Sequence, residues 1–216
     1  MDQTSTVLSC RQVWEDMNLA TAESGPMGLV RNFCRRINMS HGAFLVETEL
    51  FPKEALIAYS AYNLGQHVSQ EQHDAYFSAH RGGSQGDYRE GIQEKIANIV
   101  DCLIKFPSSK RAVLTIPNKS NALHTSDEDA KCLREIHFYL DMNMNFDSSV
   151  LNVMTLNATV LMRAQASEIF PKNVHFIGML METIADAMNT SPEMEGCRVE
   201  VGELFYLATT LVSVRW

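Results

Sequence analysis

FPKNVHFIGMLMETIADAM, residues 170–188, constrains the architecture of this chain more than any other segment. The four residues Phe170 to Asn173 interrupt the preceding structure, and a helix is predicted from Val174 to Met188. Hydrophobic side chains fall on nearly every side of that helix. A helix that is apolar all round is usually central and buried. We therefore expect one buried helix with the other elements arranged around it.

Helices and strands are predicted on both sides of this segment. The clearest helix is Tyr88 to Phe106, in which isoleucine, valine and leucine recur on one face. Segments rich in β-branched residues predict strands. Together these elements predict the α+β class, with helices packed on a mostly antiparallel or mixed sheet. The other predicted elements are helices over Leu8–Ala20 and Phe51–Leu64, a polar loop over Gln66–Asp87, and strands over Lys110–Ile116, Glu135–Met142, Ser149–Met162 and within Arg198–Trp216.

Composition bounds the class of protein. The length of 216 residues suits a single domain covering 1–216. With 18 basic and 26 acidic residues the net charge is −8, which argues against general binding of nucleic acid or of an anionic membrane surface. A membrane helix needs roughly 18 to 20 uninterrupted apolar residues, and no such stretch is present. The five cysteines are widely spaced and form no C-x-x-C pair, so we expect no disulfide framework, no metal site and a cytoplasmic location.

Several short motifs follow one another between about residues 88 and 202. A helix runs into a basic strand that ends in Asn118, and a cysteine precedes a His-Phe-Tyr motif. A strand then ends in arginine, and a proline-asparagine motif opens the buried helix. The motifs are Ser109-Lys110-Arg111, Cys132 with His137-Phe138-Tyr139, Met162-Arg163-Ala164, Phe170-Pro171-Lys172-Asn173-Val174 and Glu200-Val201-Gly202-Glu203. In type and in order, these motifs resemble those of the thymidylate synthase and pyrimidine-nucleotide hydroxymethylase family.

The resemblance implies a fold, a reaction and a set of site residues. It implies a thymidylate-synthase-like mixed sheet around a buried central helix, and transfer of a methyl or hydroxymethyl group to C5 of a pyrimidine nucleotide or related heterocycle. The implied donor is 5,10-methylenetetrahydrofolate, without a metal, and the implied assembly is a homodimer. Cys132 would be the nucleophile and Arg163 its activating, phosphate-binding partner. Lys110 and Arg111 would reach the phosphate of the other subunit, and Asn173 would bind the pyrimidine edge.

Each assignment has a simpler alternative. A lone cysteine at the start of a strand is often a small buried apolar residue. Arg163 can equally be a surface charge, and Lys110 with Arg111 can be a solvated basic pair. Asn173 is also a natural N-cap, because its side chain can accept a backbone N–H two or three residues later. The cap and the base-binding role are compatible.

The departures from the family motifs favour a second hypothesis. Leu133 stands where the family has a histidine after the cysteine, and Ala58 stands at the position of its helix glutamate. Val212 and Val214 replace the histidine and tyrosine that bind the sugar hydroxyl. Loss of a carboxylate weakens proton transfer. The alternative is therefore a catalytically inactive homologue that acts as a binding or structural protein.

Overall fold

A seven-stranded mixed sheet forms the base of the protein. The computed structural model describes residues 6–25, 28–78, 86–117, 131–143 and 152–213. The strands are ordered β1-β2-β7-β5-β4-β3, and β6 also pairs with β7. Helices complete an α+β architecture, as the sequence predicts. The strands are β1 (Val7–Leu8), β2 (Leu29–Asn38), β3 (Val113–Thr115), β4 (Leu133–Asn143), β5 (Asn152–Met162), β6 (Gln165–Ala166) and β7 (Cys197–Val212).

Strand β7 lies at the centre of the sheet and organises it. It pairs antiparallel with β2 and parallel with both β5 and β6. Parallel neighbours need a crossover connection, and helix α5 (Phe170–Asn189) supplies it between β6 and β7. Strand β6 pairs with β7 beyond the end of β5, so the chain enters α5 directly above the edge where β5 stops. This connection places the first turn of α5 at the carboxyl end of β5.

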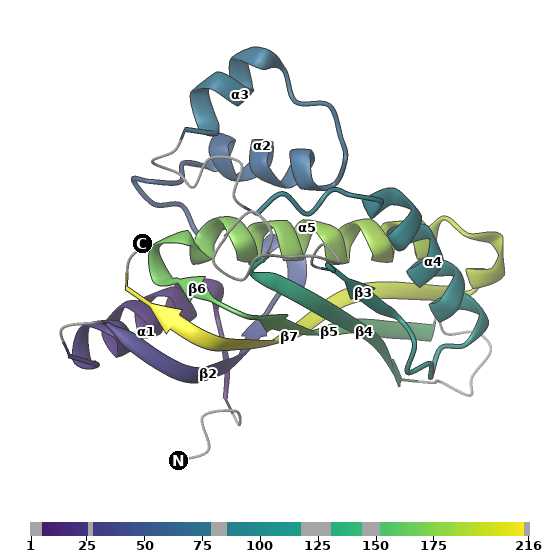
Figure 1. Cartoon of the computed structure of the whole chain (residues 1–216). Helices are drawn as coiled ribbons and strands as arrows, with labels where there is room; N and C mark the ends of the chain where they lie inside the picture. The colour runs from purple at the N-terminus through teal and green to yellow at the C-terminus, as the bar shows by residue number, and fades with distance from the viewer. Residues whose placement is uncertain (1–5, 26–27, 79–85, 118–130, 144–151, 214–216) are drawn as a thin grey trace.

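The helices lie on one face of the sheet. Helices α1, α2 and α4 all contact α5, and α3 contacts α2 (Figure 1). Within the described ranges, no helix covers the opposite face of the sheet. The helices are α1 (Cys10–Glu23), α2 (Lys53–Asn63), α3 (Gln70–Tyr76) and α4 (Ile92–Lys105), with short 3-10 turns η1 (Ser40–Gly42), η3 (Ser167–Ile169) and η4 (Pro192–Met194).

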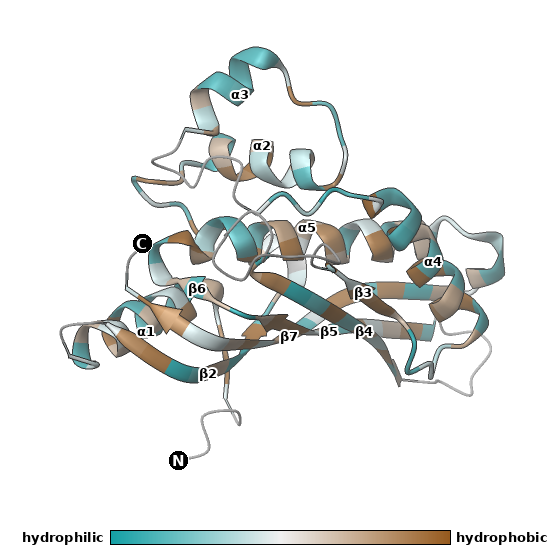
Figure 2. Cartoon of the chain, in the orientation of Figure 1, coloured by the Kyte–Doolittle hydropathy of each residue, from teal (hydrophilic) through white to brown (hydrophobic). Residues whose placement is uncertain are grey.

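Helix α5 is the buried helix that the sequence predicts. Its side chains Phe176, Leu180 and Ile184 are fully or almost fully buried, and hydrophobic residues recur along the helix and the strands next to it (Figure 2). A Cβ atom on Gly178 would overlap the ring of Phe44, so glycine permits this close approach. None of the described helices is long and apolar enough to cross a membrane.

The structure corrects several sequence-based expectations. Helix α5 begins at Phe170 instead of Val174, because η3 runs straight into it and Pro171 fits the first turn, where no N–H is needed. Asn173 is therefore inside the helix, and the N-cap assignment is wrong. The segment predicted as a polar loop contains α3, which a Ser69–Gln72 capping box starts. The sequence analysis also missed strand β2.

Candidate functional site

The side chains of Cys132 and Arg163 meet at one end of the sheet. Cys132 immediately precedes β4 and Arg163 immediately follows β5, and these antiparallel strands pair Leu133 with Met162. The Arg163 amide donates to the Cys132 carbonyl oxygen at 2.7 Å. The Arg163 Nη2 atom lies 3.8 Å from the Cys132 sulfur. Cys132 as a whole is half-buried. A guanidinium beside a thiol favours the thiolate, which is the nucleophilic form.

Three buried tyrosines from different elements interact electrostatically with Cys132. Tyr59 comes from α2, Tyr88 from the turn before α4 and Tyr206 from β7. Burial is the main cause that raises the pKa of each phenol above its usual value, and negative charge on Cys132 adds to it. For Tyr88, a backbone hydrogen bond with Leu133 and the charge of Arg163 act in the opposite direction. The phenols therefore stay protonated and serve as hydrogen-bond donors.

Gln165 links the sheet to the first turn of α5. Its Oε1 atom accepts a 2.5 Å hydrogen bond from the Tyr206 hydroxyl and a 2.9 Å hydrogen bond from the Asn173 amide. Gln165 and Asn173 are both buried, and Tyr206 is completely inaccessible. Shared acceptors of this kind fix the orientation of the groups that donate to them. Asn173 therefore points from α5 toward the strand ends that carry Cys132 and Arg163.

A cationic group lies on the helix side of the same site. Lys172 is 4% exposed, and its Nζ atom is 4.4 Å from the centre of the Tyr59 ring. An ammonium over an aromatic face is attracted by the ring's electron density. Tyr59 thus interacts with the ammonium at the start of α5 and, electrostatically, with Cys132.

The structure does not bring Lys110 and Arg111 to Cys132 within one chain. These residues lie between α4 and β3, where Ser109 Oγ accepts the Arg111 amide at 3.1 Å. The next residue, Ala112, pairs through its carbonyl with Phe138 in β4. From Cys132 to Phe138 is six residues of extended chain, or about 20 Å at 3.3 Å per residue. No arginine side chain spans that distance.

Five residues of this site escaped the sequence analysis as functional candidates: Tyr59, Tyr88, Gln165, Lys172 and Tyr206. One signal was available, because Lys172 is a lone cation at the start of an otherwise apolar segment, and buried charges are expensive. The tyrosines gave no signal, since buried aromatic residues are common core components.

Two of the residues that depart from the family motifs can be located. Ala58 is buried in α2, and Leu133 is buried at the start of β4. Val214 falls outside the described residues.

A metal centre finds no support in the described part of the chain, where no group of three or more histidine, cysteine, aspartate or glutamate residues is arranged to hold an ion. Comparison of the sequence with protein-family models and with curated proteins gives no match.

Proposed function

We propose that this protein transfers a one-carbon unit, methyl or hydroxymethyl, to C5 of a pyrimidine nucleotide or a related heterocycle, in the manner of thymidylate synthases. Cys132 is the nucleophile. The observation that carries the proposal is the 3.8 Å separation between the Cys132 sulfur and the Arg163 guanidinium, two groups from separate strands. Their meeting at a half-buried position beside a polar network is what a cysteine nucleophile requires.

In the proposed reaction each residue has a defined role. The Arg163 guanidinium favours the thiolate and holds the nucleotide phosphate. The Cys132 thiolate adds to C6 of the pyrimidine, which makes C5 nucleophilic toward the one-carbon donor. Asn173, oriented by Gln165, contacts the edge of the base. The protonated Tyr88 provides a hydrogen-bond donor near the ring, and the Tyr206 hydroxyl donates to Gln165, which orients Asn173.

The proposed donor is 5,10-methylenetetrahydrofolate. Its fused ring needs an aromatic surface to stack on, and the described residues form an aromatic cluster next to Tyr59. There the rings of His73 and Phe77 stack at 4.8 Å, and Tyr62 lies 5.0 Å from Phe77. Aromatic faces of this kind stack on planar ligands. These residues would hold the donor, which supplies the one-carbon unit when bound.

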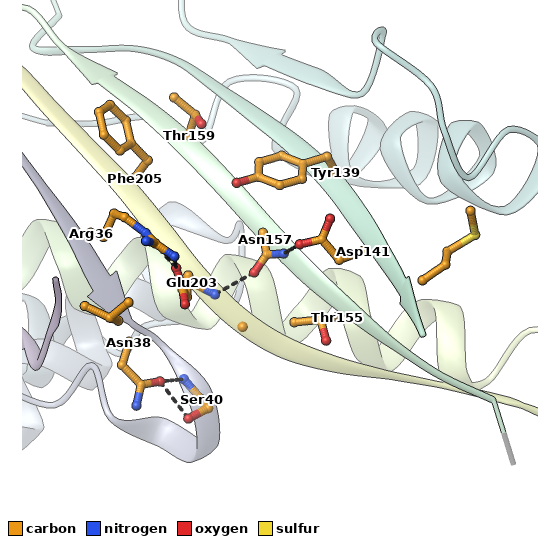
Figure 3. A pocket seen from close by; sticks show the side chains of 13 residues that line it. Arg36, Asn38, Ser40, Tyr139, Asp141, Thr155, Asn157, Thr159, Glu203 and Phe205 are labelled. Carbon is orange, nitrogen blue, oxygen red and sulfur yellow. Dashed lines mark hydrogen bonds and ion pairs between the residues drawn. The ribbon is translucent and has the colours of Figure 1, made fainter. Parts of the chain in front are cut away.

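A homodimer completes the proposal, because Lys110 and Arg111 are too distant to serve their own chain. The proposed interface is the uncovered face of the sheet, where the side chains labelled in Figure 3 line a pocket. Arg36 and Glu203 form a 2.6 Å ion pair there, and Asn157 donates to Asp141 at 2.8 Å. A two-fold interface places the same patch on both subunits. A face that carries both charge signs together with Phe205 is able to complement itself.

Nucleotide binding and cysteine protection together test the proposed function. Melting temperature is measured with uridine, cytidine and thymidine monophosphates in their deoxy forms and with inorganic phosphate. Saturation at about a hundred times the dissociation constant adds about 2.7 kcal/mol to the free energy of unfolding. Iodoacetamide labelling of Cys132 is then followed by peptide mapping, with Cys132→Ser as the blank and Cys197 as an internal reference. A stabilising nucleotide that slows labelling of Cys132 alone supports the proposal; absence of stabilisation by every nucleotide overturns it.

A second candidate function is an inactive homologue that binds or scaffolds. Ala58, buried in α2 at the position of the family's glutamate, favours it, since a methyl group moves no proton. Exchange of the nucleotide's C5 hydrogen for solvent deuterium distinguishes the two candidates. An inactive homologue binds the nucleotide but does not promote this exchange. A catalytic Cys132 promotes that exchange, and Cys132→Ser abolishes it.

A further inference from the structure

The backbone of Arg163 lies in an interruption of the sheet. Strand β5 pairs with β7 up to Met162, and β6 resumes the pairing with β7 at Gln165. Arg163 forms a bend in the gap between these two strands. The direction in which its long side chain leaves the sheet is set at this bend. Any contact that fixes the bend therefore also fixes the position of the guanidinium.

The side chain of Thr209 bridges this interruption. Thr209 lies in β7 at the level of the gap, one residue beyond Ala208, which is the last partner of β5. The Thr209 hydroxyl donates to the Arg163 carbonyl oxygen at 2.6 Å. On the other side, the Arg163 amide donates to the Cys132 carbonyl oxygen at 2.7 Å. The two peptide groups that flank the Arg163 side chain are thus held, one by β7 and the other by the residue before β4.

Threonine suits this position for a physical reason. A β-branched side chain is stiff at χ1, so the hydroxyl stays directed at the carbonyl oxygen. The bond is exposed, and its net contribution to stability is modest, because it replaces hydrogen bonds to water. Its main effect is geometric. It limits the orientations open to Arg163, whose Nη2 atom lies 3.8 Å from the Cys132 sulfur.

We propose that Thr209 is a positioning residue that holds the Arg163 guanidinium beside the Cys132 sulfur and thereby keeps the thiol reactive. This inference rests on the proposed function, in which Cys132 is the nucleophile and Arg163 favours its thiolate. The attraction between two charges falls as their separation grows. A guanidinium that swings away from the sulfur therefore stabilises the thiolate less, and Thr209 acts on the reaction through Arg163.

Alkylation of Cys132 by iodoacetamide, followed as a function of pH, tests the proposal. Thr209→Val keeps the shape and stiffness of the side chain but lacks the hydroxyl. We expect the pH midpoint of the alkylation rate to rise and the rate at neutral pH to fall about threefold, less than the roughly tenfold loss expected when the guanidinium itself is removed. Thr209→Ser retains the hydroxyl and should recover most of the rate. Thr210→Val is the matched control, because the hydroxyl of this neighbouring residue bonds Arg31 instead, and it should keep the wild-type profile.

A double-mutant cycle separates positioning from a general loosening of the fold. In an Arg163→Gln background there is no guanidinium to hold, so Thr209→Val should slow the alkylation of Cys132 no further. An equal loss of rate in both backgrounds, or an unchanged pH midpoint in Thr209→Val, overturns the role of Thr209. If Thr209→Val does not fold, Thr209→Ala removes the same hydroxyl and takes its place in the cycle.

The outcomes distinguish the positioning role from the proposed function. Absence of stabilisation by every nucleotide refutes the function, while the alkylation rates, which are measured without nucleotide, still decide the role of Thr209. Stabilisation by a nucleotide together with an unchanged alkylation profile in Thr209→Val refutes the positioning role alone.

Discussion

The Ser60 hydroxyl and the His175 imidazole Nδ1 lie 2.7 Å apart, and this hydrogen bond joins α2 to α5 inside the protein. Phe44 meets the imidazole edge-on, with ring centres 5.5 Å apart. Burial lowers the pKa of His175 from 6.5 to about 4. The helix that carries Tyr59 is therefore attached to the helix that carries Lys172 through a neutral histidine.

Acid is expected to weaken the fold through His175. Between pH 6.5 and about pH 4 the unfolded imidazole binds a proton that the folded one does not. The free energy of unfolding therefore decreases as the pH falls through this window, by about 3 kcal/mol at most. Urea unfolding at several pH values should show that slope in the wild type and in His67→Asn, an exposed control. His175→Asn should lack it, and an equal slope in that variant would exclude this histidine as the cause.

Removal of the guanidinium should make Cys132 less reactive. In Arg163→Gln no cation remains 3.8 Å from the sulfur, so the thiolate fraction at neutral pH decreases. We expect alkylation of Cys132 by iodoacetamide at pH 7 to slow about tenfold, the change that 1.4 kcal/mol of lost stabilisation produces. Arg163→Lys should retain most of the rate. Labelling of Cys197 in the same sample monitors general unfolding, and equal Cys132 rates in all three proteins would contradict the pairing.

Loss of the shared acceptor should destabilise the interior. Gln165→Leu leaves the Tyr206 hydroxyl and the Asn173 amide without their common partner. Each buried unsatisfied group costs about 1–3 kcal/mol, so for the two groups we expect a total decrease of about 2–6 kcal/mol in the free energy of unfolding. Tyr206→Phe removes only one of the two bonds and should cost about half as much. Denaturant titration measures the free energy of unfolding of both variants. An unchanged value in Gln165→Leu would show that the Tyr206 and Asn173 hydrogen bonds to Gln165 do not stabilise the fold.

The contact between Gly178 and Phe44 should not tolerate a methyl group. In Gly178→Ala the new Cβ overlaps the Phe44 ring, and overpacking of a core typically costs about 1–3 kcal/mol. This cost outweighs the gain of at most about 1 kcal/mol that alanine brings to a helix. In a Phe44→Leu background the penalty should shrink, and a double-mutant cycle measures the coupling. If the effects of the two substitutions on the free energy of unfolding were strictly additive, the cost of Gly178→Ala would not come from its contact with Phe44.

The proposed dimer should respond to charge on the uncovered face. Arg36→Glu sets two carboxylates side by side in each chain, in place of the 2.6 Å ion pair with Glu203. Sedimentation analysis should show weaker self-association, and the double variant Arg36→Glu with Glu203→Arg should recover it. Lys105→Glu, which disrupts an exposed pair with Asp101 on α4, serves as control. A monomeric wild type at micromolar concentration would refute the dimer.

The sequence was most informative where a pattern reflects burial. The all-round apolar helix and the single apolar stripe of residues 88–106 became α5 and α4, because hydrophobic periodicity follows directly from what a helix must bury. Strand β2 was missed because Arg31, Arg35 and Arg36 interrupt its alternation, although only Phe33 and Ile37 need to face the core. Arg35 faces that side as well, paired with Asp16 of α1 at 2.9 Å.

The site was only partly predictable, for a physical reason. Cys132 and Arg163 were singled out through the resemblance to a known family, and antiparallel pairing of β4 with β5 brings them together. Tyr59, Tyr88 and Tyr206 are far apart in sequence, so only the folded chain reveals that they share one environment. Their roles depend on burial and neighbouring charge, which sequence patterns do not encode for isolated aromatic residues.

Successive residues of β7 face opposite sides of the sheet, and this alternation connects the uncovered face with the interior. Phe205 points to the uncovered face, and Tyr206, the next residue, bonds Gln165 in the interior. One peptide unit thus separates a surface available to a second subunit from the hydrogen bonds that orient Asn173. If the proposed dimer forms through this face, a displacement of the strand would reach the hydrogen bonds of Gln165 without an intervening layer, so the proposed association and the proposed nucleotide binding should be thermodynamically coupled.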